Sequence, residues 1–246
     1  MKKALAKFAV GTIGRTLFRI IFKIKFEGKE HLPKDGPLLV ISNHFTWFEA
    51  PLLIAFLPYG ASFVAAVEMR RFWWFRAGEF AYDLVCIWRG QVDRKAMNHI
   101  SSLLNEGRVV GIFPEGGVNP KLQDAIARGE QVNTAAGNLV RDPLELVEAR
   151  PGTAFMALRH DVQILPVAVL GTEATKGELN LFNRVPITIR YGKPFGPLKI
   201  DKKLRGQAKR DRMDEIGHEM MLELARLFPP EKQGAFREII AAERGE

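Results

Sequence analysis

Short apolar runs bounded by glycine, proline or polar residues alternate along the chain with segments whose apolar residues recur every three or four positions. The short runs are typical of buried strands, and the periodic segments are typical of helices. The pattern predicts strands at 38–41, 62–67, 84–88, 109–113, 163–170 and 185–191, and helices at 50–57, 93–105 and 152–159. Charged helices are expected from about residue 203 onward, with a break at Pro229-Pro230.

This alternation indicates an α/β fold: a single domain with a mostly parallel mixed sheet flanked by helices. No linker or repeat divides the chain. We expect an N-terminal basic amphipathic helix at 1–25, a main domain at 26–200 and a C-terminal helical extension at 201–246. The polar insertion at about 118–150 fits a lid or, more simply, a surface loop.

The N-terminal segment is strongly basic, because residues 1–26 carry seven Lys or Arg residues and no acid. Its apolar positions form a helical stripe, with basic residues on the remaining arc. The stripe comprises Val10, Ile13, Leu17, Ile20, Ile21 and Ile24, and the basic arc comprises Lys7, Arg15, Arg19 and Lys23. Such a helix is typical of an anionic membrane surface. The alternative is a helix that docks its apolar face on the protein's own core.

The net charge of +8 fits either nucleic acid or an anionic membrane, and the isoleucine-rich stripe favours the membrane. The longest uncharged run, 50–67, contains two prolines that would break a spanning helix. The uncharged stretch 8–14 is too short for a signal peptide. We therefore expect a peripheral or monotopic membrane protein on the cytoplasmic face, with no nucleic-acid partner. The aromatic cluster at 72–75 fits either a second lipid contact or packed core residues.

The single cysteine, Cys86, excludes an internal disulfide and suits a reducing compartment. It lies in an apolar run, so a small packed residue is a better interpretation than a nucleophile. No His, Cys and Asp residues have the spacing of a metal site. We expect neither a metal nor another cofactor.

One candidate for chemistry follows the predicted strand at 38–41. His44 leaves the end of this strand, and Glu49 comes five residues later at the start of a predicted helix. A general base needs an imidazole whose second nitrogen is held by an acceptor. A turn between the two residues would bring the carboxylate back onto the ring.

A second candidate follows the strand at 109–113. Here Glu115 is followed by Gly116 and Gly117. Glycines let the backbone approach a ligand closely, and their amides can bind an anion. Taken alone, the segment also fits a plain strand-to-loop turn.

Together these segments resemble the lysophospholipid acyltransferase family, which includes lysophosphatidate acyltransferases. The family's first motif, Asn-His with four residues and then an acid, is similar to Asn43, His44 and Glu49, in the His-X4-Asp/Glu spacing. Its later motifs are similar to residues 87–90, 113–116 and 164–168. The similarity covers roughly residues 26–196, so the main domain would be an acyltransferase domain.

The resemblance implies an O-acyltransferase that moves a fatty acyl chain from acyl-CoA or acyl-carrier protein to a hydroxyl of a lysolipid. His44 would be the base and Glu49 would orient it. The residues implied in substrate binding are Asn43, Thr46, Arg89, Glu115, Gly116 and Gly117. Arg89 would contact the acceptor's phosphate, and Glu115 with Gly116 would position its glycerol.

Two departures from the family pattern bear on the acceptor. Position 49 is Glu where lysophosphatidate acyltransferases usually carry Asp, and Gly117 and Val118 stand where Thr-Arg is common. One candidate phosphate ligand is therefore missing. This leaves a glycolipid or other non-phosphate lipid as an alternative acceptor, and a catalytically silent membrane-binding protein on the same fold as a further one.

Overall fold

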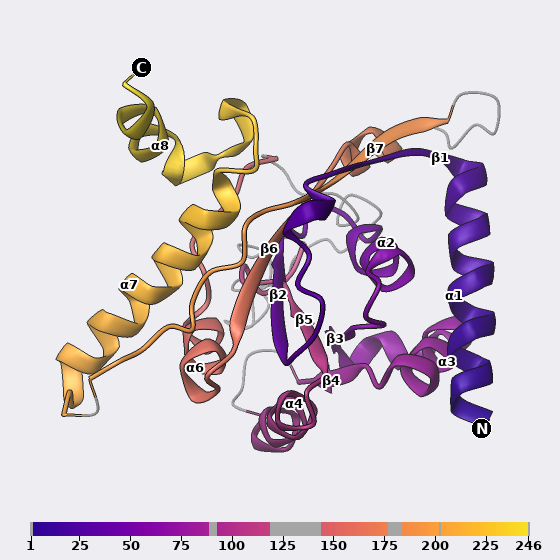
Figure 1. The fold of residues 1–246 in the computed structure, drawn as a ribbon, viewed down its shortest axis with the longest axis horizontal. Coiled ribbons are helices and arrows are strands. Elements are labelled where there is room, and N and C mark those ends of the chain that lie inside the picture. The colour runs from indigo at the N-terminus through magenta and orange to yellow at the C-terminus, as the bar shows by residue number, and fades with distance from the viewer. Residues whose placement is uncertain (1, 89–92, 119–143, 177–183, 202, 246) are drawn as a thin grey trace, which may run out of the picture.

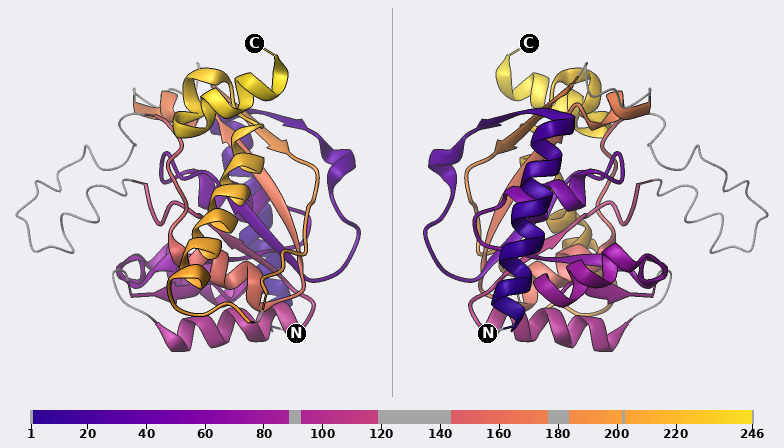
Figure 2. Two further views of the ribbon diagram at one scale, coloured as in Figure 1. Left: turned by 90° about the vertical axis from the view of Figure 1, so that its left-hand side faces the viewer. Right: turned by 90° about the vertical axis from the view of Figure 1, so that its right-hand side faces the viewer.

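The computed structural model describes residues 2–88, 93–118, 144–176, 184–201 and 203–245. The described residues form a seven-stranded sheet in the order β1-β7-β6-β2-β5-β3-β4, with helices on both faces (Figure 1 and Figure 2). The strands are β1 (Phe22–Glu27), β2 (Leu38–Ser42), β3 (Ser62–Ala66), β4 (Val85–Ile87), β5 (Val109–Ile112), β6 (Gln163–Leu170) and β7 (Val185–Tyr191). Neighbours are parallel except β6 and β7, which are antiparallel. The predicted mostly parallel mixed sheet is confirmed.

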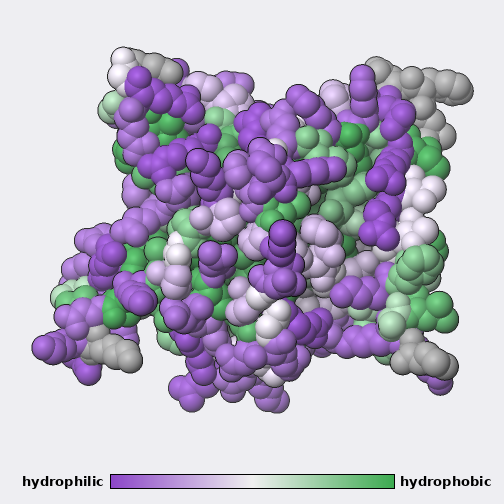
Figure 3. Space-filling view, in the orientation of Figure 1, coloured by the Kyte–Doolittle hydropathy of each residue, from purple (hydrophilic) through white to green (hydrophobic). Residues whose placement is uncertain are grey.

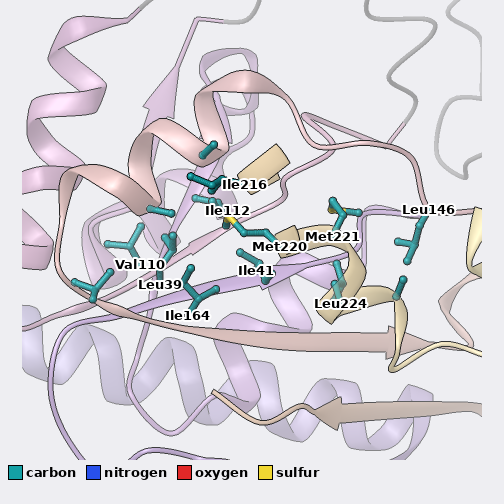
Figure 4. Packing of buried hydrophobic residues seen from close by; sticks show 14 of the residues in the cluster. Leu39, Ile41, Val110, Ile112, Leu146, Ile164, Ile216, Met220, Met221 and Leu224 are labelled. Atoms are coloured by element: carbon teal, nitrogen blue, oxygen red, sulfur yellow. The ribbon is translucent and has the colours of Figure 1, made fainter. Parts of the chain in front are cut away.

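The sheet is the middle of three layers, with a layer of helices on each face. Successive side chains of β2 point to opposite faces and contact different helices. Leu39 and Ile41 join a cluster with residues of α4 (Arg94–Asn105), α6 (Pro151–Arg159), α7 (Gly206–Ala225) and α8 (Arg237–Arg244), part of which is shown in Figure 4. Leu38 and Val40 join a second cluster with residues of α1 (Lys2–Ile21), α2 (Glu49–Phe56) and α3 (Trp73–Tyr82). Central strands that are buried on both faces explain the continuous apolar runs in the sequence.

The predicted strands and the three predicted internal helices begin and end within one residue of the observed elements. For α4 the start is fixed by a cap: Asp93 accepts a hydrogen bond from the backbone N–H of Ala96 at 3.0 Å. Helix α3 and strand β1 were not among the predicted elements.

The predicted helix at 1–25 is too long. Helix α1 ends at Ile21, and β1 pairs in parallel with β7 at the edge of the sheet. The reason is that the spacing of the apolar residues changes from that of a helix to that of a strand. Phe22 and Ile24 alternate with the exposed Lys23 and Lys25, which is strand spacing. The boundary predicted between residues 25 and 26 therefore falls inside a strand.

The predicted apolar stripe of α1 does not face in one direction. Val10 and Ile21 are turned toward the second cluster, whereas Ile13, Leu17 and Ile20 are exposed. The inward side also carries glycine where the helices come close, and a Cβ on Gly11 would lie 2.6 Å from the Tyr82 hydroxyl. Helix α1 is thus packed against α2 and α3 and still exposes apolar side chains.

The C-terminal helices complete the first cluster. Ile216, Met220 and Leu224 of α7 are fully buried in it (Figure 4). Most of the predicted insertion, residues 119–143, lies outside the described residues. At its end Leu146 is buried, and its N–H donates to the Lys232 carbonyl at 3.0 Å. This end of the predicted surface loop is therefore part of the core.

Candidate active site

Three loops that follow parallel strands meet at one edge of the sheet. His44 follows β2, Glu115 follows β5, and Thr172 follows β6. Strand β2 lies between β5 and β6 in the sheet. The parallel direction of these strands brings residues that are distant in sequence to one place, as expected for sites in α/β folds.

His44 and Glu49 form the pair that their spacing predicts. The Nδ1 atom of His44 lies 3.2 Å from Oε2 of Glu49. The histidine side chain is 16% exposed and that of Glu49 is fully buried. The imidazole also stacks on Phe113, with 4.2 Å between ring centroids. The ring is therefore held at one nitrogen and on one face, with a small part of its surface reachable.

A dense set of hydrogen bonds holds the buried Glu49 carboxylate. The Thr46 N–H donates to Oε1 at 2.9 Å and to Oε2 at 2.8 Å, and the Thr46 hydroxyl donates to Oε1 at 3.0 Å. The Thr172 hydroxyl donates to Oε1 at 2.5 Å. Glu49 is also the first residue of α2, where the backbone dipoles favour negative charge. Such hydrogen bonds compensate for the burial of a polar side chain.

Asn43 was predicted to bind substrate, but its contacts indicate a structural role. Its side chain is fully buried, with Nδ2 donating to the Val169 carbonyl at 3.0 Å and Oδ1 accepting from the Val169 N–H at 2.9 Å. The amide thus extends the pairing of β2 with β6 by one residue. Thr46, also a predicted substrate ligand, is buried and bound to Glu49.

Glu115 is fully buried and joins two segments of the backbone. Oε1 accepts from the His44 N–H at 3.2 Å, and Oε2 accepts from the Val147 N–H at 3.1 Å. It therefore lies beside His44. These contacts fix the backbone of the base rather than present a carboxylate to a ligand.

Gly116 and Gly117 form the turn after Glu115, with φ angles of 82° and 151°. These are left-handed values that favour glycine. The Gly116 N–H donates to the Phe113 carbonyl at 3.0 Å, and a Cβ at Gly116 would lie 2.9 Å from Cγ of Arg150. Both the backbone conformation and the close approach of Arg150 explain glycine at 116. Binding of substrate by either glycine stays a prediction.

Arg89 lies outside the described residues, so its predicted contact with the acceptor stays a prediction. The neighbouring Trp88 follows β4, the edge strand that is separated from β2 by β3 and β5. Its side chain is 56% exposed.

Cys86 on β4 has the character of a packed thiol. Burial raises the pKa of Cys86 to about 11, and the nearby Glu79 carboxylate acts in the same direction. A thiol with this pKa is protonated at neutral pH and is a poor nucleophile. This agrees with the interpretation that Cys86 is not a catalytic group.

Sequence reasoning missed Thr172 and the ring of Phe113. Thr172 directly follows β6, but a threonine after a strand carries no distinctive signal, and Glu49 lies 123 positions away. Phe113 belongs to a segment singled out for its acid and glycines. The signal that could have identified Phe113 as a site residue is its position at the end of a strand, next to Pro114.

Comparisons with known proteins agree with this geometry. A family model described as Acyltransferase matches residues 23–170. The chain is 30% identical over 136 residues to a lyso-ornithine lipid O-acyltransferase of Pseudomonas aeruginosa, covering 54% of the chain and 47% of the relative. It is 33% identical over 99 residues to a 1-acyl-sn-glycerol-3-phosphate acyltransferase of Bacillus subtilis, covering 38% of the chain and 47% of the relative. The chain thus spans about half the length of these relatives.

A solved structure shares the fold. The crystal structure of PlsC, the 1-acyl-sn-glycerophosphate acyltransferase of Thermotoga maritima, superposes with a TM-score of 0.57 at 18% identity, covering 87% of this chain and 77% of that one. At this identity the likeness concerns the fold alone. The family model, in contrast, covers more than half of the chain and includes both the His44–Glu49 pair and Glu115. The chain therefore belongs to the acyltransferase family.

Proposed function

We propose that this protein is an O-acyltransferase that moves a fatty acyl chain from acyl-CoA or acyl-carrier protein to a hydroxyl of a lysophospholipid such as lysophosphatidate. The observation that carries the proposal is the partly exposed His44 imidazole, with Nδ1 3.2 Å from the buried Glu49 carboxylate. Family membership supports the same reaction class.

The pair suits general base catalysis. With Nδ1 facing Glu49, Nε2 of His44 is the nitrogen that takes the proton from the acceptor hydroxyl. The acceptor oxygen attacks the thioester carbonyl carbon, and the tetrahedral intermediate collapses as the C–S bond breaks. The thiolate leaves and regains a proton from the imidazolium. Glu49 stabilises that imidazolium through the whole sequence.

Two substitutions test the base. His44→Ala removes the imidazole and should lower kcat by ~10²–10⁴-fold, the usual contribution of general base catalysis. Glu49→Gln keeps the size of the side chain and removes its charge, so it should also lower kcat heavily, and Glu49→Asp more mildly. The matched control is His31→Ala, because Nδ1 of His31 lies 2.9 Å from the Tyr191 carbonyl, on the other side of β6. Near wild-type turnover in purified His44→Ala would refute the assignment.

A second acceptor class is supported by two observations. The Pseudomonas aeruginosa relative is named for a lyso-ornithine lipid acceptor. In addition, Gly117 and Val118 stand where the family often carries Thr-Arg. A panel of lysophosphatidate, lyso-ornithine lipid and lysoglycolipid acceptors, with products identified by mass spectrometry, separates the two classes. If the acceptor carries a phosphate, Arg89→Ala should raise its KM at least tenfold while the donor KM changes little.

We also propose that α1 rests on the cytoplasmic face of an anionic membrane. Within the described ranges no helix is both long and apolar enough to cross a bilayer. The outward side of α1 nevertheless exposes large apolar side chains along its length (Figure 3, right-hand edge). These are Leu5, Phe8, Ile13, Leu17 and Ile20, each at least 50% exposed.

Two basic side chains of α1 are turned toward the protein, whereas its other basic residues are exposed. Lys7 is half-buried, with Nζ 5.6 Å from the centroid of the Tyr82 ring. Arg15 is also half-buried and donates to the Ala55 carbonyl at 3.4 Å. A helix in water exposes its charges and buries its apolar residues. The inward position of these two cations, together with the outward apolar side chains, favours a lipid environment outside α1.

Helix α3 packs against α1 and adds aromatic surface. Trp73 is 81% exposed, whereas Phe75 is buried in the second cluster. The aromatic cluster at 72–75 therefore has both an exposed and a packed member. Exposed tryptophans are typical of the interface between lipid and water.

Outward substitutions test membrane binding better than deletion, because deleting α1 would uncover the core. The triple variant Phe8→Ser, Ile13→Ser, Leu17→Ser removes exposed side chains that contribute ~1.5–3 kcal/mol each when fully buried in an apolar phase. It should lose binding to phosphatidylglycerol-containing vesicles in a flotation assay. The control, Phe155→Ser with Ile239→Ser, removes exposed apolar residues from the other face of the sheet. Equal binding by both variants would place the contact elsewhere.

A further inference from the structure

Thr172 is a buried hydroxyl next to the proposed base that the general mechanism leaves without a task. It is fully buried and begins the short 3-10 helix Thr172–Lys176 that follows β6. Its hydroxyl donates to Oε1 of Glu49 at 2.5 Å, across 123 positions of sequence. This short contact joins the loop after β6 to the first residue of α2.

The partners of Glu49 divide its two oxygens between two tasks. Oε1 receives the hydroxyls of Thr46 and Thr172. Oε2 faces Nδ1 of His44 at 3.2 Å. The Thr46 N–H donates to both oxygens. A carboxylate that is fixed at one oxygen cannot rotate the other away from its partner. The Thr172 hydroxyl, together with the hydroxyl and N–H of Thr46, therefore sets the direction in which Oε2 points.

The turn that carries Thr172 is held by its own contacts. The Thr175 hydroxyl donates to the Thr172 carbonyl at 2.6 Å, and Glu173 accepts from the Gly171 N–H at 3.1 Å. Lys232 forms an ion pair with Glu173. The hydroxyl of Thr172 is thus presented from a fixed backbone, which is what orientation of a catalytic group requires.

The contact also depends on glutamate at position 49. An aspartate carboxylate would end one methylene closer to the backbone of α2 and would withdraw from Thr172. Thr46 is close in sequence and can follow a shorter side chain, whereas Thr172 lies in the loop after β6. The hydrogen bond from the Thr172 hydroxyl is therefore specific to glutamate at position 49.

We propose that Thr172 is a positioning residue for the His44–Glu49 pair: its hydroxyl fixes Oε1 so that Oε2 stays on Nδ1 of His44. The proposal rests on the proposed function, because it assigns a role within the same site. Thr172 acts through Glu49 and has no required contact with substrate.

The kinetic test compares Thr172→Val, which keeps the shape and removes the hydroxyl, with Thr172→Ser, which keeps the hydroxyl. Loss of a hydrogen bond to a charged group should lower kcat about 10- to 100-fold. The KM values for donor and acceptor should stay within about twofold, and Thr172→Ser should recover most of kcat. In a Glu49→Asp background Thr172→Val should have little further effect, because the shorter acid no longer reaches the hydroxyl.

The matched control is Thr175→Val, which removes a hydroxyl from the same turn without touching Glu49. If it lowers kcat as much as Thr172→Val, the turn matters and the hydroxyl does not, which overturns the proposal. The proposal also fails if Thr172→Val keeps kcat within twofold, or if its effect is the same in the Glu49→Asp background.

A spectroscopic measurement separates this proposal from the proposed function. The ¹⁵N and ¹H resonances of the His44 ring report whether Nδ1–H is held by a carboxylate. Thr172→Val should change them, and Thr175→Val should not. An unchanged His44 spectrum in Thr172→Val overturns the positioning role even if the enzyme is active. A wild-type protein that acylates no acceptor but shows the Thr172-dependent change refutes the acyltransferase reaction and retains the positioning role.

Discussion

Two hydrogen bonds join the side-chain amide of Asn43 to the backbone of Val169, one in each direction, at 3.0 and 2.9 Å. Because Asn43 directly precedes His44, this double contact with β6 determines where the proposed base leaves the sheet. The Asn-His sequence therefore combines an anchor with a base.

The first prediction concerns this anchor. Asn43→Asp keeps the shape but cannot donate to the Val169 carbonyl, so two acceptors would face each other in a fully buried place. An unsatisfied buried group costs ~1–3 kcal/mol. We expect a lower Tm and a lower kcat, because His44 would shift. Thermal denaturation with an activity assay checks both, and an unchanged Tm would show that the contact is not needed.

The second prediction concerns the packing of α1. Replacing glycine by alanine inside a helix usually stabilises it by about 1 kcal/mol. At Gly11, however, the added Cβ would lie 2.6 Å from the Tyr82 hydroxyl, whereas at Gly14 it would lie 3.7 Å from Cβ of Ala55. Gly11→Ala should therefore lower Tm and Gly14→Ala should not. A higher Tm for Gly11→Ala would mean that α1 does not pack closely on α3.

The third prediction concerns acid stability. Asp83 accepts from Arg108 at 2.7 Å and from Lys3. Burial opposes its charge, but the hydrogen bonds from Lys3 and Arg108 lower the pKa of Asp83 overall. A lowered pKa stabilises the fold above the unfolded value of ~3.9 and ceases to do so as the pH falls through the folded value.

Asp83→Asn should therefore lower Tm at pH 7, by an amount that corresponds to ~1 kcal/mol for a partly exposed ion pair. The difference from wild type should vanish at about pH 2–3. The exposed Asp35→Asn serves as the control. A difference that persists at pH 2 would mean that the loss comes from packing rather than from charge.

The fourth prediction concerns the thiol of Cys86, whose pKa burial raises to about 11. Alkylation by iodoacetamide at pH 8 should be ~100-fold slower than that of a free thiol with a pKa of ~8.5, because the thiolate reacts. The rate should rise about tenfold per pH unit up to about pH 10. A plateau reached below pH 9 would contradict the raised pKa.

The central strands are predictable because burial on both faces leaves uninterrupted apolar runs such as 38–41. Strand β1 is not, because Lys23 and Lys25 fit a helical stripe as well as an alternating strand. Its partner β7 decides between them, and a pairing with a distant strand leaves no local signal. Helix α3 is not predictable either, because its first turn exposes the apolar Trp73 and buries Phe75, so its apolar residues do not mark one buried face.

In the candidate site, too, local contacts could be predicted from the sequence and distant ones could not. The spacing of His44 and Glu49 lies within one loop and predicts their contact. Glu49 and Glu115 also have partners in other loops, so their contacts with Thr172 and the Val147 backbone could not be predicted from the sequence. Asn43 carries a polar side chain in a motif, and sequence alone cannot tell a ligand contact from a backbone contact.

The position of β1 has a consequence for how the chain is made. Glu27 of β1 and its hydrogen-bond partner Arg190 of β7 are 163 positions apart. During synthesis α1 and β1 leave the ribosome long before β7, which is the neighbour that β1 has in the described sheet. Until then β1 has no strand partner, although α1 can already pack on α2 and α3, which are made earlier. The unpaired edge of β1 and the outward apolar side chains of α1 are therefore exposed during synthesis, and a chaperone or an early contact with lipid would protect them from aggregation.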